Sequence, residues 1–406
     1  MISVAEALDL LERESAPLEI TTVPLAQAGG RVLAQPVAAD RDFPPTDRSA
    51  MDGFAVRAAD VVRRGAVLEL VGEVRAGQPL GQLRLEAGQA ARIMTGGIVP
   101  PGADAIVMVE KTAEVDGGRR VRIDDEVRRG QHVRVRGQDL ACGRQVLEPG
   151  TPIRAAEIAT LASVGQASVR VHATPVVHVL ATGDEIVEPD RRPQEHQVRN
   201  SNAHALLGQL AEAGIAACYL GIAGDEPQPL RQAIVRGLAG DLLLITGGVS
   251  VGRYDLVHDA LCAEGMRLLF HGVSMKPGKP LLAGRCGRCL VLGLPGNPLS
   301  TFTCFVVFVA PVLRRLLGHR RWSNRCLPAT LDEPLDAPPG RETYHLARLE
   351  QGADGLVARV VPSTGSGDVL ALARANAFIV TPRAGACLAA GAVTPVLPVT
   401  FQGFPE

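Results

Sequence analysis

Three apolar runs in the second half of the chain each pass directly into a polar turn. They read VVHVLATGDEIV (176–187), DLLLITGGVSVGRYD (241–255) and CLVLGLPGNPLS (289–300). The segments 203–214, 229–240 and 255–265 have apolar residues at helical spacing, and each ends in the glycine expected at a helix C-terminus. Strands that alternate with such helices predict a doubly wound, mostly parallel sheet whose carboxyl ends share one crevice.

The flanking segments have different patterns. Between Gly65 and Val127, short alternating stretches broken by glycine and proline predict a small β domain inserted into another unit. From about Leu327 onward, YHLARLEQGADGLVARVV, AFIVTP and VTPVLPV predict the strands of a second all-β unit. Near the N-terminus we expect a helix over 4–13 and a second helical stretch that ends at Leu33. A chain of 406 residues is too long for one ordinary core, so we expect an α/β protein of several domains.

The three turns after the central strands carry complementary chemical groups. Asp184 and Glu185 place two carboxylates at a strand end, and carboxylates suit a hard cation such as Mg²⁺. The alternative is that these acids only cap the turn. The turns 246–252 and 294–300 offer backbone N–H groups, the second at the start of a long apolar helix, where an anion is favoured. The pattern therefore predicts chemistry on a phosphorylated or oxyanionic substrate.

Lysine is rare in this chain. Among 42 lysines and arginines, only Lys111, Lys276 and Lys279 are lysine, and two of them share the short loop MKPGKP. An ammonium is a compact point charge whereas a guanidinium is a planar fork, so the two lysines indicate a specific role. A solvated loop charge is the simpler alternative. The net charge of −1 and the 3% of aromatic residues argue against a nucleic-acid partner.

Eight cysteines are scattered along a chain without a secretory leader, which is typical of a reduced cytosolic protein, so we expect a cytoplasmic location. Cys286 and Cys289 have the spacing of a metal or redox pair. They lack a second pair and lie in a predicted hairpin turn, so a zinc or thiol role is disfavoured. The apolar run 302–317 is shorter than a membrane span and contains Pro311, so a membrane partner is not expected.

Further motifs accompany these turns. TGDE, TGGVSVGRYD, MKPGKP and GLPGNPLS follow PPTDRSAMDGFAV (44–56) and RIMTGG (92–97), and Ser366-Gly367 lies downstream. In these motifs the chain resembles the MoeA family of molybdopterin molybdotransferases, whose eukaryotic relative is the E domain of gephyrin. The central motifs are also shared with adenylylating enzymes of the same pathway and with CinA-like proteins. The segments SAMDGFAV and RIMTGG narrow the resemblance to the molybdotransferases.

The resemblance implies four domains and an elongated homodimer. It implies a discontinuous dimerisation domain (22–43 and 143–174), an inserted β domain (44–142), a central molybdopterin-binding α/β domain (1–21 and 175–326) and a C-terminal β barrel (327–406). It also implies that the crevice of one central domain is completed by the inserted β domain of the partner chain.

The resemblance further implies a reaction of adenylyl-molybdopterin with molybdate, assisted by Mg²⁺, that releases AMP and leaves molybdenum on the dithiolene sulfurs. The catalytic acids implied are Asp52, Glu185, Asp225 and Asp255. The metal-side carboxylates implied are Asp184, Glu185 and Asp255. The residues implied for molybdate are Lys276, Lys279, Arg348 and Ser366. The residues implied for substrate binding are Thr95, Asp139, Thr182, Gly183, Gly247, Gly248, Ser250, Pro295, Gly296, Asn297 and Pro298.

Two other functions share part of this pattern. An adenylyltransferase that uses ATP on molybdopterin would share the central motifs, and a gephyrin-like scaffold would keep the pocket without turnover. The upstream motifs favour the molybdotransferase, and the intact acids and lysines disfavour the scaffold. Asn200 stands where the family usually has an acid, and asparagine is also a natural N-cap for the helix that follows. An adenylyltransferase and molybdoenzymes are the expected partners that deliver and receive the cofactor.

Overall fold

The computed structural model of the protein describes residues 1–248 and 256–400. The chain divides into two compact units. The first comprises Met1–Gln35, Pro149–Ala155 and Ser168–Glu406, and the second comprises Pro36–Glu148 and Ala156–Ala167. Two residues implied in the site, Ser250 and Asp255, lie outside the described residues.

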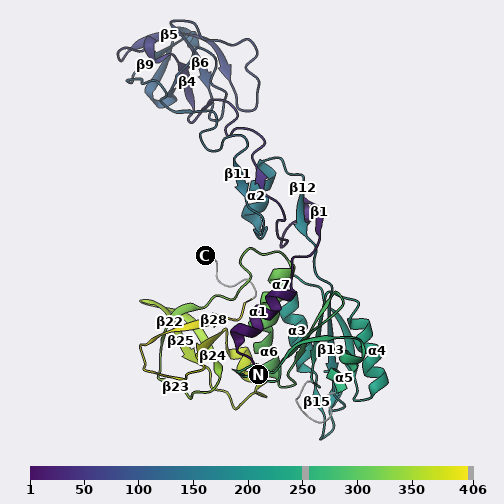
Figure 1. Cartoon of the computed structure of the whole chain (residues 1–406). Helices are drawn as coiled ribbons and strands as arrows, with labels where there is room; N and C mark the ends of the chain where they lie inside the picture. The colour runs from purple at the N-terminus through teal and green to yellow at the C-terminus, as the bar shows by residue number, and fades with distance from the viewer. Residues whose placement is uncertain (249–255, 401–406) are drawn as a thin grey trace. The chain divides into compact units, whose positions relative to one another are not determined.

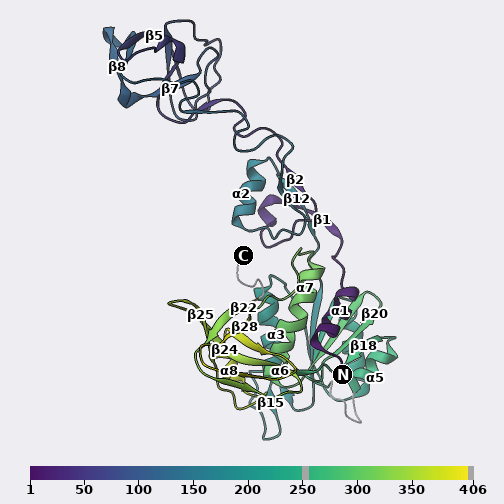
Figure 2. The same cartoon turned by 60° about the vertical axis from the view of Figure 1, so that its left-hand side comes forward.

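A six-stranded sheet forms the centre of the first unit (Figures 1 and 2). In spatial order its strands are β16 (Cys218–Ala223), β13 (Val177–Thr182), β17 (Leu242–Thr246), β21 (Cys289–Leu294), β20 (Leu282–Cys286) and β18 (Arg267–His271). The first four run parallel, β20 pairs antiparallel with β21, and β18 pairs antiparallel with β20 at the edge of the sheet. The predicted doubly wound, mostly parallel sheet is therefore confirmed.

Helices cover both faces of this sheet (Figure 1). Leu242 and Leu244 of β17 share a core with α1, α3, α6 and α7, whereas Leu243 and Ile245 share a second core with α4 and α5. The bounds are α1 (Val4–Glu14), α3 (Ser201–Glu212), α4 (Pro227–Gly237), α5 (Leu256–Ala263), α6 (Pro298–Cys304) and α7 (Ala310–Leu316). Successive strand residues point to opposite faces, so a strand buried on both faces reads as an uninterrupted apolar run.

The helix that follows β21 is longer than the sequence predicted. A π-helical turn, η5 (Phe305–Val309), joins α6 to α7, so that Pro298–Leu316 forms 19 helical residues. The expectation that this run is too short to span a membrane is therefore wrong for its length. In the described part of the chain it is the one helix long and apolar enough for a span, and 83% of its apolar window is buried. A mostly buried core helix has the same length and hydropathy.

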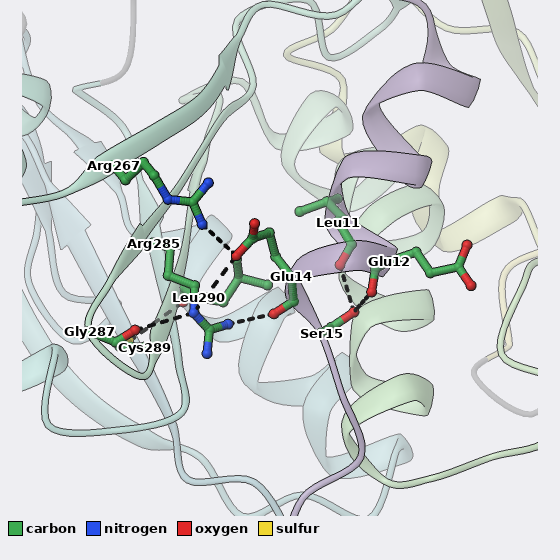
Figure 3. Close-up of polar contacts among 9 residues, drawn as sticks. All are labelled: Leu11, Glu12, Glu14, Ser15, Arg267, Arg285, Gly287, Cys289 and Leu290. Atoms are coloured by element: carbon green, nitrogen blue, oxygen red, sulfur yellow. Dashed lines mark hydrogen bonds and ion pairs between the residues drawn. The ribbon is translucent and has the colours of Figure 1, made fainter.

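The C-terminal end of α1 is tied to one side of the sheet (Figure 3). Arg267 of β18 pairs with the Glu14 carboxylate at 2.7 Å, and Arg285 of β20 donates to the Glu14 carbonyl. Ser15 Oγ donates to the Leu11 carbonyl at 2.6 Å, so two carbonyls of the last helical turn have partners. These contacts hold α1 against the antiparallel strands.

Five strands near the C-terminus close into a barrel, as predicted. They are β22 (Leu327–Leu331), β24 (Glu342–Gly352), β25 (Gly355–Val360), β26 (Ala377–Thr381) and β28 (Val393–Pro398). The ring closes because the long strand β24 pairs with both β25 and β26. The short strand β19 (Met275–Lys276) joins β24 in parallel, and α8 (Val369–Arg374) follows the loop 363–368.

The remaining elements of the first unit are short. Strand β1 (Ile20–Pro24) pairs with β12 (Ser168–His172), β14 (Ile186–Val187) with β15 (Val198–Arg199), and β23 (Leu335–Ala337) with β27 (Ala386–Leu388). The second helical stretch predicted before Leu33 is only a 3-10 turn, η1 (Leu25–Gln27). Gly30 adopts a φ of +77°, which a continuing right-handed helix does not allow.

The second unit contains the predicted inserted β structure. Its sheet has the order β7 (Ala105–Met108), β4 (Gly53–Val56), β6 (Gln89–Ile93), β5 (Ala66–Val74), β9 (Arg120–Ile123) and β8 (Thr112–Val115). Phe54, Val107 and Ile123 are among its buried core residues. The shorter elements are β2 (Val37–Ala38), β3 (Arg48–Ser49), η2 (Ala58–Asp60), η3 (Val109–Lys111), η4 (Asp116–Gly118), β10 (Val133–Arg134), β11 (Gln145–Leu147) and α2 (Ala155–Ser163).

Candidate active site

Three of the predicted turns meet at the carboxyl edge of the central sheet, because β13, β17 and β21 are neighbours. We call residues 182–185, 246–248 and 294–298 the strand-end turns. Thr182 Oγ1 donates to the Thr246 carbonyl over 3.4 Å, and the Gly247 N–H donates to the Leu294 carbonyl over 3.2 Å. Residues implied in substrate binding that are far apart in the sequence therefore lie together.

The glycines of the strand-end turns are required by close backbone packing. Gly247 has a φ of +90°, and a Cβ there would lie 2.5 Å from the Thr182 carbonyl oxygen. Gly248 has a φ of +65°, and its Cβ would lie 2.8 Å from Thr182 Oγ1. Any other L-residue would be strained at both positions, so these glycines bring the backbone of β13 and β17 into direct contact.

Asp184 and Glu185 occupy different positions in the acidic turn. Asp184 Oδ1 accepts a hydrogen bond from the Asp225 N–H at 2.9 Å, so this carboxylate reaches across to the end of β16. The Glu185 side chain folds back over Gly183, where a Cβ would lie 2.5 Å from Glu185 Oε2. All three acids are exposed. The structure thus places the Asp225 backbone beside the Asp184 carboxylate.

The donor set fits the Mg²⁺ that the resemblance implies. In proteins this ion is commonly held by one or two carboxylates together with water and substrate phosphates, so a cage made only of protein is not required. The described residues contain no group of three or more His, Cys, Asp or Glu side chains that could hold a metal. Asp184 and Glu185 offer hard, exposed carboxylate oxygens, and the third expected ligand, Asp255, is outside the described residues.

The PGNP turn contacts the loop before α8. Asn297 Nδ2 donates to Ser366 Oγ over 3.0 Å, and the Leu299 N–H donates to the Ser366 carbonyl, also over 3.0 Å. Asn297, implied for substrate binding, and Ser366, implied for molybdate, are therefore joined by a hydrogen bond. The N–H of Leu299 is not free for an anion, so the helix start offers fewer donors than the sequence predicted.

The lysine loop, residues 275–280, lies between the central domain and the barrel. Lys276 ends β19, and the Val273 N–H donates to the Lys279 carbonyl over 2.9 Å. Gly278 has a φ of +116°, and a Cβ there would lie 2.8 Å from Cys304 Sγ, so the loop backbone packs directly on α6. Both lysine side chains are exposed. Two positive charges are thus presented on a backbone that is fixed by packing.

Residues of β24 flank the lysine loop. Burial, and then the charge of Lys276, lower the pKa of His345, whose Nε2 lies 3.1 Å from Thr381 Oγ1. Arg348 is exposed on the same strand and pairs with Glu350 over 3.3 Å. Arg348 thus pairs with another residue of its own strand, and its predicted place beside Ser366 remains a prediction.

The site residues predicted upstream belong to the second unit. Asp52 Oδ1 accepts hydrogen bonds from the Thr95 N–H at 2.6 Å and from Thr95 Oγ1 at 2.8 Å, and these bonds lower the pKa of Asp52. Asp52 and Thr95, from two separate sequence motifs, therefore form one exposed polar group. Asp139 forms an ion pair with Arg134. Its carboxylate is thus already partnered within the unit.

Comparison with known proteins finds relatives along nearly the whole chain. The MoeA N-terminal region (domain I and II) matches residues 2–165, the probable molybdopterin binding domain matches 178–315, and the MoeA C-terminal region (domain IV) matches 328–399. A molybdopterin molybdenumtransferase of Nostoc sp. is 38% identical over 372 residues, which cover 89% of this chain and 84% of the relative. The chain belongs to the MoeA family.

Other similar proteins extend this finding. A molybdopterin molybdenumtransferase of Bacillus subtilis is 34% identical over 90% of this chain and 86% of the relative. A crystal structure of a molybdopterin biosynthesis MoeA protein from Pyrococcus horikoshii superposes with a TM-score of 0.85 at 29% identity, and the match covers 100% of both chains. The resemblance to the MoeA family and the multidomain α/β fold class are therefore confirmed.

Asn200, where the family usually has an acid, caps α3. Its Oδ1 accepts from the Ala203 N–H over 3.1 Å, and its Nδ2 donates to the Tyr219 hydroxyl over 2.7 Å. The Tyr219 hydroxyl in turn donates to Glu188 over 2.7 Å, and burial raises the pKa of Tyr219. The N-cap interpretation of Asn200 is confirmed, and sequence reasoning missed the Tyr219 and Glu188 contacts.

Sequence reasoning also missed Asn202. This residue lies within the first turn of α3, where its side chain donates to both Thr246 and Gly296. A detectable signal existed, because asparagine has low helix propensity and a second asparagine two residues after the cap Asn200 invites explanation.

The cysteine pair does not have the environment of a reactive site. Cys286 and Cys289 are directly opposite each other in the β20–β21 hairpin, which confirms the predicted hairpin turn. Burial raises the pKa of both thiols, that of Cys289 to about 12, and Cys286 Sγ donates to the Glu264 carbonyl over 2.9 Å. The thiolate form, which is the nucleophile and metal ligand, is therefore disfavoured.

Proposed function

We propose that the protein is a molybdopterin molybdenumtransferase of molybdenum cofactor biosynthesis. The observation that carries this proposal is the meeting of the strand-end turns with the Ser366 loop, in a chain that matches the MoeA family over nearly its whole length. Relatives named molybdopterin molybdenumtransferase share 30–38% identity with this chain. The acids of the TGDE turn and both lysines of the 275–280 loop are present.

The proposed reaction consumes adenylyl-molybdopterin and molybdate, releases AMP and leaves molybdenum on the dithiolene sulfurs. The strand-end turns bind the anionic substrate, with Gly247 and Gly248 allowing the backbone to approach closely. Asp184 and Glu185 would hold Mg²⁺, which supplies charge neutralisation and polarisation of the phosphate oxygens. Lys276 and Lys279 hold molybdate, and Ser366 is held beside the PGNP turn by Asn297.

The second unit of a partner chain would supply the remaining polar groups of the site. Asp52, already oriented by Thr95, is proposed as a catalytic acid, and Asp139 as a substrate-binding residue. We further propose that the protein works as a homodimer in the cytoplasm, with the inserted β domain completing the crevice of its partner. An adenylyltransferase delivers the substrate and molybdoenzymes receive the product.

The experiment that tests the function is AMP release from purified adenylyl-molybdopterin, with and without molybdate and Mg²⁺. We expect AMP only when both are present, together with insertion of molybdenum. Consumption of ATP on molybdopterin without molybdate would instead indicate an adenylyltransferase. A protein that binds a partner but releases no AMP under any condition would indicate a scaffold.

A further inference from the structure

Asn202 lies where the helix α3 meets two strand-end turns. Its Nδ2 donates to Thr246 Oγ1 over 3.0 Å and to the Gly296 carbonyl over 2.7 Å. A side-chain amide has two hydrogens to donate, so both are used, one at the end of β17 and one just after β21. The residue therefore connects two adjacent parallel strands from a third element.

The two turns that Asn202 connects approach each other through glycine backbone. Gly247 and Gly296 face each other, and an ideal Cβ on Gly296 would lie 3.8 Å from Gly247 Cα. The Gly247 N–H already donates to the Leu294 carbonyl, but glycine has the widest backbone freedom of any residue, so a further restraint narrows the spacing of the two turns. The hydrogen bonds from Asn202 provide such a restraint.

Asn202 also lies in the middle of a longer chain of contacts. Thr182 Oγ1 donates to the Thr246 carbonyl on one side. On the other side, Gly296 is followed by Asn297, whose amide donates to Ser366 Oγ. Contacts that begin at the Asn202 amide thus connect Thr182, the Thr246 and Gly296 turns, and the Ser366 loop. The carboxylates of the TGDE turn and the lysine loop are outside this set of contacts.

The Asn202 side chain is not arranged for stability alone. Its Oδ1 is buried and has no hydrogen-bond partner in the described part of the chain, a situation that native proteins usually avoid. Asn200, two residues earlier, offers the contrast, because both ends of its amide are hydrogen-bonded. The Asn202 amide donates both of its hydrogens to the Thr246 and Gly296 turns although its oxygen stays unpaired. A role in positioning these two turns explains this arrangement best.

We propose that Asn202 is a positioning residue that sets the spacing of the Thr246 and Gly296 turns for the anionic substrate. It acts through these turns rather than by touching the reacting atoms. The inference rests on the proposed function, in which the strand-end turns bind the adenylylated pterin and the lysine loop binds molybdate. Loss of Asn202 should therefore weaken use of the first substrate and leave the second unaffected.

The test compares Asn202→Ala with the matched control Asn200→Ala. For Asn202→Ala we expect the KM for adenylyl-molybdopterin to rise about tenfold, with an unchanged KM for molybdate and a nearly unchanged Tm. For Asn200→Ala, which removes a helix cap, we expect Tm to fall by about 2 to 4 °C with unchanged KM values. If Asn202→Ala leaves the pterin KM unchanged, or lowers Tm as much as the control does, the proposal is wrong.

Two further measurements complete the test. Thr246→Val removes the hydroxyl that Asn202 binds, so adding it to Asn202→Ala should raise the pterin KM by less than the product of the two single effects. Hydrogen exchange of the Gly247 and Gly296 amides in the ligand-free protein should be faster in Asn202→Ala than in the wild type. If the wild type releases no AMP, the proposed function fails, and the exchange rates alone then decide about Asn202, with equal rates overturning its role.

Discussion

The side-chain amide of Asn297 donates a hydrogen bond to Ser366 Oγ, 3.0 Å away, and thereby joins the α/β domain to the C-terminal barrel. The two residues are 69 positions apart, and the Leu299 N–H reinforces the contact by donating to the Ser366 carbonyl. The PGNP turn and the loop 363–368 are therefore one connected part of the candidate site. Substitutions in these segments can be designed to separate effects on substrate binding from effects on folding.

Gly296 and Gly247 provide one such separation. A Cβ on Gly296 meets its nearest atom at 3.8 Å, an ordinary contact, whereas a Cβ on Gly247 would lie 2.5 Å from the Thr182 carbonyl oxygen. We expect Gly296→Val to fold with near-normal stability but to lose substrate affinity, because its branched side chain enters the space beside the turn. Gly247→Ala should lose about 1–3 kcal/mol of stability, because φ is +90° there.

Calorimetric titration with adenylyl-molybdopterin and thermal unfolding check both expectations. A folded Gly296→Val protein that binds as tightly as the wild type would remove the PGNP turn from the site. A Gly247→Ala protein with unchanged Tm would show that the turn can relax.

Glu185 is the acid whose removal best tests the metal proposal. Glu185→Gln keeps the shape of the side chain but removes its charge, so we expect a higher Mg²⁺ requirement and AMP release lowered about tenfold or more. The exposed side chain predicts little change in folding. The matched control is Glu195→Gln, a change at another exposed acid of the same segment. Normal turnover of Glu185→Gln at low Mg²⁺ would leave only a structural role for this acid.

Lys276 and Lys279 test whether charge alone is sufficient. Each changed to arginine keeps its charge but gains a larger, planar group on a loop whose backbone is fixed against α6. We expect Lys276→Arg and Lys279→Arg each to raise the KM for molybdate about tenfold, with partial rescue by excess molybdate and an unchanged KM for the pterin. Lys111→Arg, a change at the third lysine of the chain, serves as the control. If the wild type and both variants give the same curve of molybdenum insertion against molybdate concentration, positive charge alone is sufficient.

Asp52 makes a prediction about pH. Hydrogen bonds from the Thr95 N–H and hydroxyl lower its folded pKa, so this carboxylate favours folding above its unfolded pKa of about 3.9. That contribution is lost as the pH falls through the lower, folded pKa. Thr95→Val keeps the N–H but removes the hydroxyl, so the pKa of Asp52 should rise part of the way back. Titration of the Asp52 carboxyl by NMR measures it, and an identical pKa in the variant would contradict the assignment.

The central fold was predictable because its signal is local. β13, β17 and β21 are buried on both faces, so each reads as an unbroken apolar run, and the glycine turns follow where the strands end. The same argument placed Thr182, Gly247 and Gly296 at one edge, because neighbouring parallel strands end together. The 3-10 turn η1 was mispredicted as a helix, since a weak periodicity was outweighed by Gly30 in a left-handed conformation.

The partners of polar side chains were decided by the tertiary structure. Asn202 lies 44 positions from Thr246 and 94 from Gly296, so nothing in its own neighbourhood shows that its amide joins them. The Leu299 N–H looks free in the sequence but donates to Ser366, and Asp139 looks available but pairs with Arg134. Hydrophobic burial follows patterns written along one segment, whereas a hydrogen bond needs a donor and an acceptor brought within about 3 Å by the packing of separate segments.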